Sequence, residues 1–302
     1  SYLHKPHLDA VLKTIDSESV RNRNFRVLLD SNHGAGGVLG RRLLEDLNCE
    51  LIALGEEPDG HFAHVPEPTE QNLQKVAARV RDKGCDVGFC QDPDADRLAL
   101  IDADGRYIGE ECTVALCVQR AMQHEATCGH VVINCATSSM TERIAADAGV
   151  TVSRSAVGEA NVVDQMLAND ATYGGEGNGG PIDPCVVLVR DSFVGMAQIL
   201  DLMQSSGKTL AQLADALPPS HMHKTKVTID AAQLPKIFQA LTDRFSDAAT
   251  DHSDGLRLSW PEQWLLVRAS NTEPIVRLIA EADTIESAQE LCAAAAEVIQ
   301  AN

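Results

Sequence analysis

The chain has 302 residues, of which 44% are hydrophobic and 4% aromatic, and its formal net charge is −19. Such a composition can fill several cores, which argues against a disordered chain and predicts two or three domains. The acidic balance argues against nucleic acid or an anionic membrane as the main partner, and no apolar run reaches the roughly 20 residues of a membrane-spanning helix.

The first 108 residues alternate helical and strand patterns. Apolar residues at helical spacing, such as Leu8, Val11 and Ile15, predict a first helix over 7–20. The elements expected after it are a strand and glycine-rich turn over 25–37, a helix over 37–48, a strand over 49–55, a helix over 69–84 with Thr69 as its N-cap, a strand over 85–91 and a hairpin over 97–108 that turns at Asp104-Gly105. This alternation predicts an α/β domain with a largely parallel sheet.

A second unit of the same kind follows over 109–217. Its expected helices cover 110–124, 140–149, 159–170 and 191–207, and its expected strands cover 129–137, 150–158 and 171–180, the last ending in a loop. Pro218 and Pro219 then mark the clearest linker, because proline stops the preceding helix.

The rhythm changes over 218–302. Strands are expected over 224–229, 255–260, 264–270 and 275–282, and helices over 231–245 and 284–300. The fold class expected for the whole chain is α/β: two consecutive α/β domains, 1–108 and 109–217, with mixed, largely parallel sheets, followed by a smaller α+β C-terminal domain, 218–302.

The sequence has nine cysteines, no C-x-x-C pair and several cysteines inside apolar runs. This pattern is typical of reduced, buried thiols and predicts a cytoplasmic location. The first residue is Ser1 rather than Met, so we expect the chain to begin inside a longer gene product.

Three carboxylates fall within five residues in the stretch "DPDADR". Asp92, Asp94 and Asp96 repel one another unless they take up protons or a cation lies among them. Oxygen ligands favour Mg²⁺ or Ca²⁺, and an EF-hand is excluded because Arg97 replaces its glycine and Ala103 its final glutamate. We therefore expect a Mg²⁺ site, with a solvated acidic turn as the alternative.

Two further loops combine polar residues with an open backbone. In "GGEGNGG", residues 174–180, Glu176 and Asn178 offer an acceptor and an amide that suit vicinal sugar hydroxyls, or they belong to a flexible loop. In "RASNTEPIVR", residues 268–277, guanidinium groups, hydroxyls and loop N–H groups suit a phosphate, or they form an N-capped turn. The expected phosphate-binding residues are Arg268, Ser270, Asn271, Thr272 and Arg277.

Two other patterns are weaker. The stretch "DSNHGAGGVLG", residues 30–40, misses the dinucleotide-binding glycine spacing by one residue, which favours an ordinary glycine-rich turn. The pairs His61/His64 and His221/His223 lack nearby cysteines or a helical His-Glu pattern, so surface histidines are favoured over a zinc site.

A Mg²⁺ loop, a hydroxyl-binding loop and a phosphate loop thus follow in that order, one on each domain. With these motifs, and with "DSNHGAG" and "PEPTEQNL", the chain closely resembles the α-D-phosphohexomutase superfamily over nearly all of its length. That group contains phosphoglucomutase, phosphomannomutase and phosphoglucosamine mutase, which have four domains around a central cleft. The resemblance places this chain on the last three.

The resemblance implies reversible phosphoryl transfer between hexose 1-phosphate and hexose 6-phosphate. A phosphoserine gives its phosphate to the sugar, and a hexose 1,6-bisphosphate intermediate turns around and returns the other phosphate. By this resemblance Asp92, Asp94 and Asp96 hold Mg²⁺, Arg97 lies near the transferred phosphoryl group, and Glu176 and Asn178 face the sugar. The residues implied to grip the other phosphate are Arg268, Ser270, Asn271, Thr272 and Arg277.

Two departures from the family pattern matter. The sequence contains no Ser-His-Asn-Pro-like loop, so the nucleophilic serine and its domain are expected upstream, and this chain by itself is expected to be an inactive fragment. Ala156 stands where many members carry lysine, and Arg154 is a possible substitute.

The main hypothesis is therefore a phosphohexomutase acting on a small hexose phosphate, with glucose, mannose and glucosamine phosphates left open. The alternatives are a non-catalytic sugar-phosphate-binding protein and, more remotely, a nicotinamide-dependent oxidoreductase. The oligomeric state cannot be read from the sequence.

Overall fold

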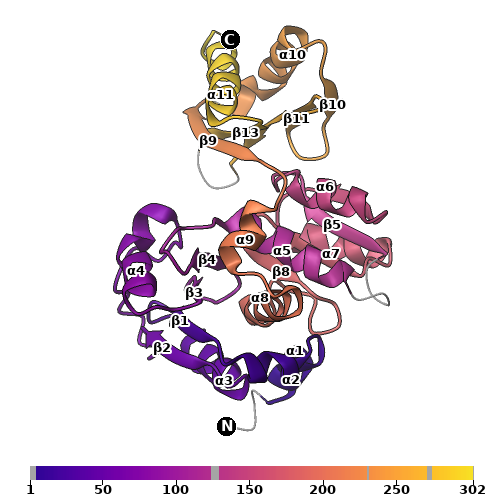
Figure 1. Cartoon of the computed structure of the whole chain (residues 1–302). Helices are drawn as coiled ribbons and strands as arrows, with labels where there is room; N and C mark the ends of the chain where they lie inside the picture. The colour runs from indigo at the N-terminus through magenta and orange to yellow at the C-terminus, as the bar shows by residue number, and fades with distance from the viewer. Residues whose placement is uncertain (1–4, 124–128, 230, 271–273, 302) are drawn as a thin grey trace.

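The computed structural model describes residues 5–123, 129–229, 231–270 and 274–301. Three sheets of four, four and five strands follow one another along these residues, each with its own helices (Figure 1). The first two are mixed sheets with parallel strands and the third is antiparallel, which confirms the predicted fold class. Within these described ranges, no helix combines the length and apolar character that a membrane crossing needs.

The first sheet has the strand order β2-β1-β3-β4. Its strands are β1 (Arg26–Asp30), β2 (Glu50–Leu54), β3 (Val87–Gln91) and β4 (Leu98–Asp102). The first three are parallel and β4 is antiparallel, so the carboxyl ends of β1 and β3 meet at one edge of the sheet. Helices α3 (Gly37–Asp46) and α4 (Glu70–Asp82) connect the parallel strands.

The expected single helix over 7–20 is wrong. The structure has two helices there, α1 (Lys5–Lys13) and α2 (Ser17–Arg23). Asp16 causes the break, because its carboxylate accepts a hydrogen bond from the backbone N–H of Ser19 at 3.1 Å and so caps a new helix. Thr69 does occupy the N-cap position of α4, but its side chain makes no capping hydrogen bond.

The second sheet has the order β6-β5-β7-β8. Its strands are β5 (His130–Asn134), β6 (Thr151–Ser155), β7 (Tyr173–Glu176) and β8 (Gly180–Ile182). Where a strand ending in a loop was expected, β7 and β8 form a hairpin whose turn is Gly177–Gly179, and Gly179 there has a φ of 88°. The helices of this unit are α5 (Glu110–Met122), α6 (Met140–Asp147), α7 (Glu159–Ala168), α8 (Ser192–Ser206) and α9 (Leu210–Asp215).

One hydrophobic core joins the first two sheets. Helix α8 is buried over most of its circumference, because apolar residues occupy nearly all of its faces. The cluster that contains its residues Ile199 and Leu202 reaches Leu29 and Phe89 of the first sheet and Ile133 of the second. Figure 1 shows α8 at the centre of this lower part of the molecule.

The third sheet has the order β10-β11-β12-β13-β9. Its strands are β9 (His221–Thr228), β10 (Ala249–Asp251), β11 (Leu256–Ser259), β12 (Trp264–Ala269) and β13 (Ile275–Ala282). A short 3₁₀ turn η1 (Ala231–Gln233), helix α10 (Leu234–Arg244) and helix α11 (Ile285–Gln300) complete the unit. Strand β10 was not predicted, since its three residues are all exposed and carry no alternating pattern.

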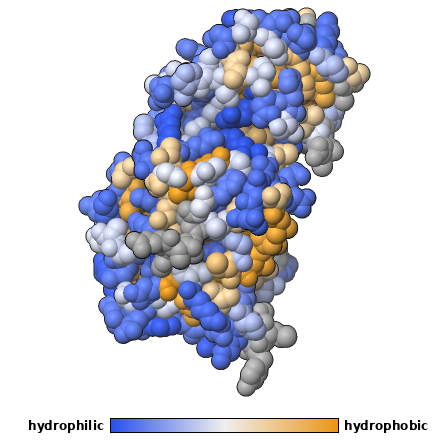
Figure 2. All heavy atoms as spheres, turned by 90° about the vertical axis from the view of Figure 1, so that its right-hand side faces the viewer, coloured by the Kyte–Doolittle hydropathy of each residue, from blue (hydrophilic) through white to orange (hydrophobic). Residues whose placement is uncertain are grey.

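The two faces of the third sheet have different neighbours. Leu265 and Val267 belong to a core with α10 and α11, whereas Trp264 and Leu266 on the opposite face pack with Cys135 of the second unit. Figure 2 views the molecule from the side on which α6 and α7 lie, and the third-sheet unit forms the upper lobe in that view. The surface where this lobe meets the other two units is mostly hydrophilic.

Candidate active site

The three aspartates predicted to bind a metal converge. Ligand oxygens of Asp92, Asp94 and Asp96 all lie within 4.8 Å of one another in the loop that follows β3. Ala95 has a φ of 62°, and this left-handed residue lets the chain fold back, so that its N–H donates to the Asp92 carbonyl at 3.1 Å. The glycine-rich turn after β1 supports the loop, since Ala35 N–H donates to the Pro93 carbonyl at 2.7 Å.

Arginine and burial give these carboxylates different properties. Burial works to raise the pKa of Asp92, but hydrogen bonds with Asp96 and Arg97 lower it below its usual value. Arg97 donates from Nε to Asp92 Oδ2 at 2.6 Å and from its backbone N–H to Oδ1 at 3.1 Å. Burial and the adjacent Asp92 carboxylate raise the pKa of Asp96 to about 7.

The acidic cluster could hold a hard divalent cation. Asp96 Oδ1 is buried and accepts no hydrogen bond from the described residues, and Arg97 Nε lies 3.7 Å away, so this oxygen remains available to an ion. Oxygen ligands at this spacing suit Mg²⁺ or Ca²⁺, and an ion there would offset the repulsion that raises the pKa of Asp96. The ligand chemistry therefore fits the predicted metal.

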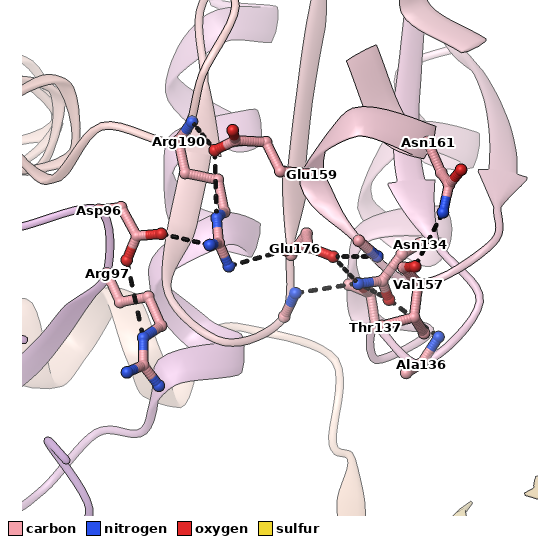
Figure 3. A network of polar contacts seen from close by, with 12 residues as sticks. Asp96, Arg97, Asn134, Ala136, Thr137, Val157, Glu159, Asn161, Glu176 and Arg190 are labelled. Carbon is pink, nitrogen blue, oxygen red and sulfur yellow. Dashed lines mark hydrogen bonds and ion pairs between the residues drawn. The ribbon is translucent and has the colours of Figure 1, made fainter. Parts of the chain in front are cut away.

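Arg190 connects residues 92–97, here called the metal loop, to residues 174–180, here called the sugar loop (Figure 3). Its Nη2 forms an ion pair with Asp96, and its Nη1 donates to Glu176 Oε2 at 2.8 Å. Glu159, at the start of α7, accepts from the Arg190 backbone N–H at 2.8 Å and lies 3.4 Å from Nε. Three carboxylates from three segments thus surround one half-buried guanidinium.

Glu176 fixes the sugar loop to neighbouring residues of the second unit. Glu176 is 3% exposed, and its Oε1 accepts from Asn134 Nδ2 at 2.6 Å and from Gly158 N–H at 2.9 Å. The Asn178 amide, oriented so that both of its atoms have partners, accepts from Arg190 Nη1 at 2.6 Å and donates to the Glu176 carbonyl at 3.2 Å. In this conformation the Glu176 carboxylate is turned toward protein groups.

Glu111 of α5 lies directly beside the sugar loop. Its Oε2 accepts from Ser138 N–H at 3.0 Å, and its Oε1 lies 3.3 Å from Nζ of Lys224 on β9. A Cβ added to Gly177 would lie 1.9 Å from Glu111 Oε2, so a side chain there would have to displace the Glu111 carboxylate. Burial raises the pKa of the adjacent Glu110 to about 7. The start of α5 therefore contacts both the sugar loop and the third sheet.

The phosphate loop begins at the end of β12. Arg268 Nε lies 3.1 Å from Asp254 Oδ2, which also accepts from Val157 N–H of the second unit at 2.9 Å. Ser270 N–H donates to the Ile275 carbonyl at 2.9 Å, and Arg277 is exposed on β13. The two other residues expected to bind phosphate, Asn271 and Thr272, lie outside the described residues.

Arg154 has structural partners. Its guanidinium forms two hydrogen bonds with the Glu142 carboxylate, at 2.8 and 2.7 Å. It also donates to the backbone carbonyls of Asn134 and Thr137. These contacts support the end of β5, which carries the Glu176 partner Asn134, and the loop that follows it.

Sequence reasoning missed Arg190, Asn134 and Glu111. The one local signal for Arg190 was its position as a single cation between an apolar run and the helix N-cap Asp191. The structure unites the metal and sugar loops through Arg190. It links the phosphate loop to the second unit through Asp254, without direct contact to Glu176 among the described residues.

Comparison with known proteins gives a consistent result. Residues 5–105, 110–221 and 223–298 match the family models described as phosphoglucomutase/phosphomannomutase alpha/beta/alpha domain II, alpha/beta/alpha domain III and C-terminal domain. A phosphoglucomutase/phosphomannomutase of Thermococcus kodakarensis is 37% identical over 293 residues, which cover 95% of this chain and 63% of that protein.

Two more similarities agree. A phosphoglucosamine/phosphogalactosamine mutase of Sulfurisphaera tokodaii is 28% identical over 91% of this chain and 62% of its own length. A crystal structure of a phosphoglucomutase/phosphomannomutase family protein from Burkholderia thailandensis shares the fold, with a TM-score of 0.78 and 24% identity, over 93% of this chain and 64% of that one. The chain thus spans less than two thirds of the length of these relatives.

Proposed function

The chain belongs to the phosphoglucomutase/phosphomannomutase family of α-D-phosphohexomutases, and from this premise we propose that it carries the metal-, sugar- and phosphate-binding parts of a phosphohexomutase. The reaction proposed for the complete enzyme interconverts hexose 1-phosphate and hexose 6-phosphate through a phosphoserine and a hexose 1,6-bisphosphate. The observation that carries this proposal is the aspartate cluster whose Asp96 is tied by Arg190 to the sugar loop.

The metal part of the proposal rests on the open oxygen of Asp96. Asp92, Asp94 and Asp96 hold Mg²⁺, which when bound offsets the negative charge of a phosphoryl group. Arg97, held by Asp92, orients toward the group in transfer, where the P–O bond to serine breaks as a new P–O bond to a sugar hydroxyl forms.

The sugar and phosphate parts of the proposal use the other two loops. Glu176 and Asn178 recognise sugar hydroxyls, which requires the Glu176 carboxylate to exchange one of its present partners for the ligand. The group proposed to bind the phosphate that is not transferred is Arg268, Ser270, Asn271, Thr272 and Arg277. A loop that accepts either phosphate explains how the bisphosphate can react in both orientations.

The three parts are proposed to act as domains with the boundaries 1–108, 109–217 and 218–302, in a cytoplasmic enzyme of small sugar phosphates. The printed sequence has no Ser-His-Asn-Pro-like loop. We therefore propose that this chain binds hexose phosphates without converting them.

The test is calorimetric titration of the chain with glucose 1-phosphate, mannose 1-phosphate and glucosamine 6-phosphate, with and without Mg²⁺, beside a coupled assay for conversion. We expect binding and no turnover by the 302 residues, and turnover when a domain with a phosphoserine loop is joined to them. Conversion by this chain alone contradicts the serine argument. Binding without turnover even with that domain supports the non-catalytic alternative.

A further inference from the structure

Three cationic residues stand in one row across the third sheet. In the antiparallel register, Arg268 of β12 lies opposite Arg277 of β13, and Arg277 lies opposite Lys226 of β9. Directly opposite residues project from the same face with Cβ atoms about 4.5–5.5 Å apart, and like charges in such positions are destabilising. The row therefore costs stability unless an anion lies beside it.

The face on which the row stands is the one that meets the second unit. Moving two residues along each strand gives the row Leu266, Ile279 and Lys224, and two more give Trp264, Glu281 and Met222. Leu266, Ile279 and Trp264 pack with Cys135. The residues that alternate with them along the strands, such as Leu265 and Leu278, face α10 and α11 instead. The cations thus extend the interface side of the sheet, at its phosphate-loop end.

The charges in this row are only partly compensated. Arg268 pairs with Asp254, and Lys224 in the next row pairs with Glu111. Arg277 and Lys226 are both exposed, and no acidic residue in the described part of the chain forms an ion pair with either. The chain has a net charge of −19, but these two adjacent cations have no carboxylate partner and create a local positive potential. Such a potential favours the binding of an anion.

We infer that Lys226 is a further phosphate-binding residue, which joins Arg277 to hold the phosphate monoester of a sugar phosphate from the edge strand β9. This inference deepens the proposed function and rests on it for the sugar. Arg277 offers a planar donor pair, and Lys226 adds a point charge from the other side of β13. A dianion bridging them removes the repulsion within the row.

The experiment compares Lys226→Met, Lys226→Arg and the control Lys75→Met, which removes one exposed cation from α4. Inorganic phosphate and glucose 6-phosphate are titrated into each chain by calorimetry, and thermal unfolding is followed with and without 20 mM phosphate, roughly the concentration that saturates a weak anion site. We expect Lys226→Met to weaken glucose 6-phosphate binding about tenfold, and Lys226→Arg to retain most of it.

A second readout separates ligand binding from a merely structural role. Without phosphate, Lys226→Met should unfold at a higher temperature than the unsubstituted chain, because the like-charge contact is gone. Addition of phosphate should raise the unfolding temperature of Lys226→Met by less than it raises that of the unsubstituted chain. A side chain that only supports the fold would instead lower the unfolding temperature in both conditions.

The outcomes for the site and for the enzyme differ. If the unsubstituted chain binds glucose 6-phosphate and Lys226→Met behaves like Lys75→Met, the inference about Lys226 is overturned and the proposed function stands. If phosphate binds in a Lys226-dependent way but no hexose phosphate binds more tightly, the anion site stands and the proposed sugar function fails. If neither ligand binds, both are overturned.

Discussion

The guanidinium of Arg190 lies against the carboxylate of Asp96, from which it is separated by 94 positions in the sequence. The same guanidinium holds Glu176 of the sugar loop at 2.8 Å. One side chain therefore balances charge in both loops, and a displacement of either loop must break or stretch a charge-assisted hydrogen bond.

Arg190→Met should lower the free energy of unfolding by about 3 kcal/mol, because it leaves the buried Glu176 carboxylate with one fewer donor and no cation. The measurement is chemical denaturation. The control Arg79→Met, on an exposed position of α4, should change the free energy by less than about 0.5 kcal/mol. Adding Glu176→Gln to Arg190→Met should recover part of the loss, and a further loss would contradict this assignment.

Asp94→Asn and Asp96→Asn should each weaken Mn²⁺ binding at least about tenfold, since each removes a charged ligand from the cluster. Titration calorimetry or the electron paramagnetic resonance of free Mn²⁺ gives the affinity. Asp104→Asn removes a carboxylate from the turn at the opposite end of β4, outside the cluster, and serves as the control. Equal effects at Asp94 and Asp104 would show that the chain attracts the ion only through its overall charge.

Metal affinity should fall as the pH is lowered through about 7. The pKa of Asp96 is raised to about 7 by burial and by Asp92, so below that pH a proton competes with the ion for the carboxylate. The loss should approach roughly tenfold per pH unit below the pKa, and Asp96→Asn should flatten the profile. A flat profile in the unsubstituted chain would rule out Asp96 as a ligand.

Gly177→Ala should destabilise the chain by about 1–3 kcal/mol, because the new methyl group collides with the Glu111 carboxylate. The matched control is Gly129→Ala, where no atom of the described residues lies within 4 Å of the added Cβ. Combining Gly177→Ala with Glu111→Ala should relieve the collision. Thermal unfolding of the four chains tests whether the cost comes from this contact or from the loop backbone.

The pair His64–Asp30 should make stability depend on pH. The hydrogen bond from Nε2 to Asp30 Oδ2, at 2.8 Å, raises the pKa of His64 above its unfolded value. The stabilisation is therefore complete below the unfolded pKa and is lost as the pH rises through the folded pKa. His64→Gln should cost more at about pH 5.5 than at about pH 8, whereas the exposed neighbour His61 substituted in the same way should show no such difference.

Much of the site could be predicted because its chemistry is local in sequence. Asp92, Asp94 and Asp96 converge within one loop, and parallel strands bring such loops to one edge of a sheet, as the alternation of elements predicts. Most helices and strands were also predicted correctly, because the periodicity of apolar residues is a local signal too. The break at Asp16 was missed because a capping carboxylate overrode an apolar pattern that continues across it.

Arg190 and Lys226 could not be predicted in this way. The partners of Arg190 come from the metal loop, the sugar loop and α7, and their meeting depends on how two sheets pack around α8. Lys226 gains its meaning only from the register of β9 on β13, because a shift of one residue would turn it to the α11 face.

The two largest hydrophobic clusters share no residue, so we expect the parts of the molecule that they stabilise to unfold separately. One cluster passes from the first sheet through α8 into the second, and the other lies between the third sheet and its two helices. Heating should therefore produce two calorimetric transitions, with residues before the Pro218-Pro219 linker melting as one cooperative block and the C-terminal lobe melting by itself. Hydrogen exchange would then give each block its own opening free energy.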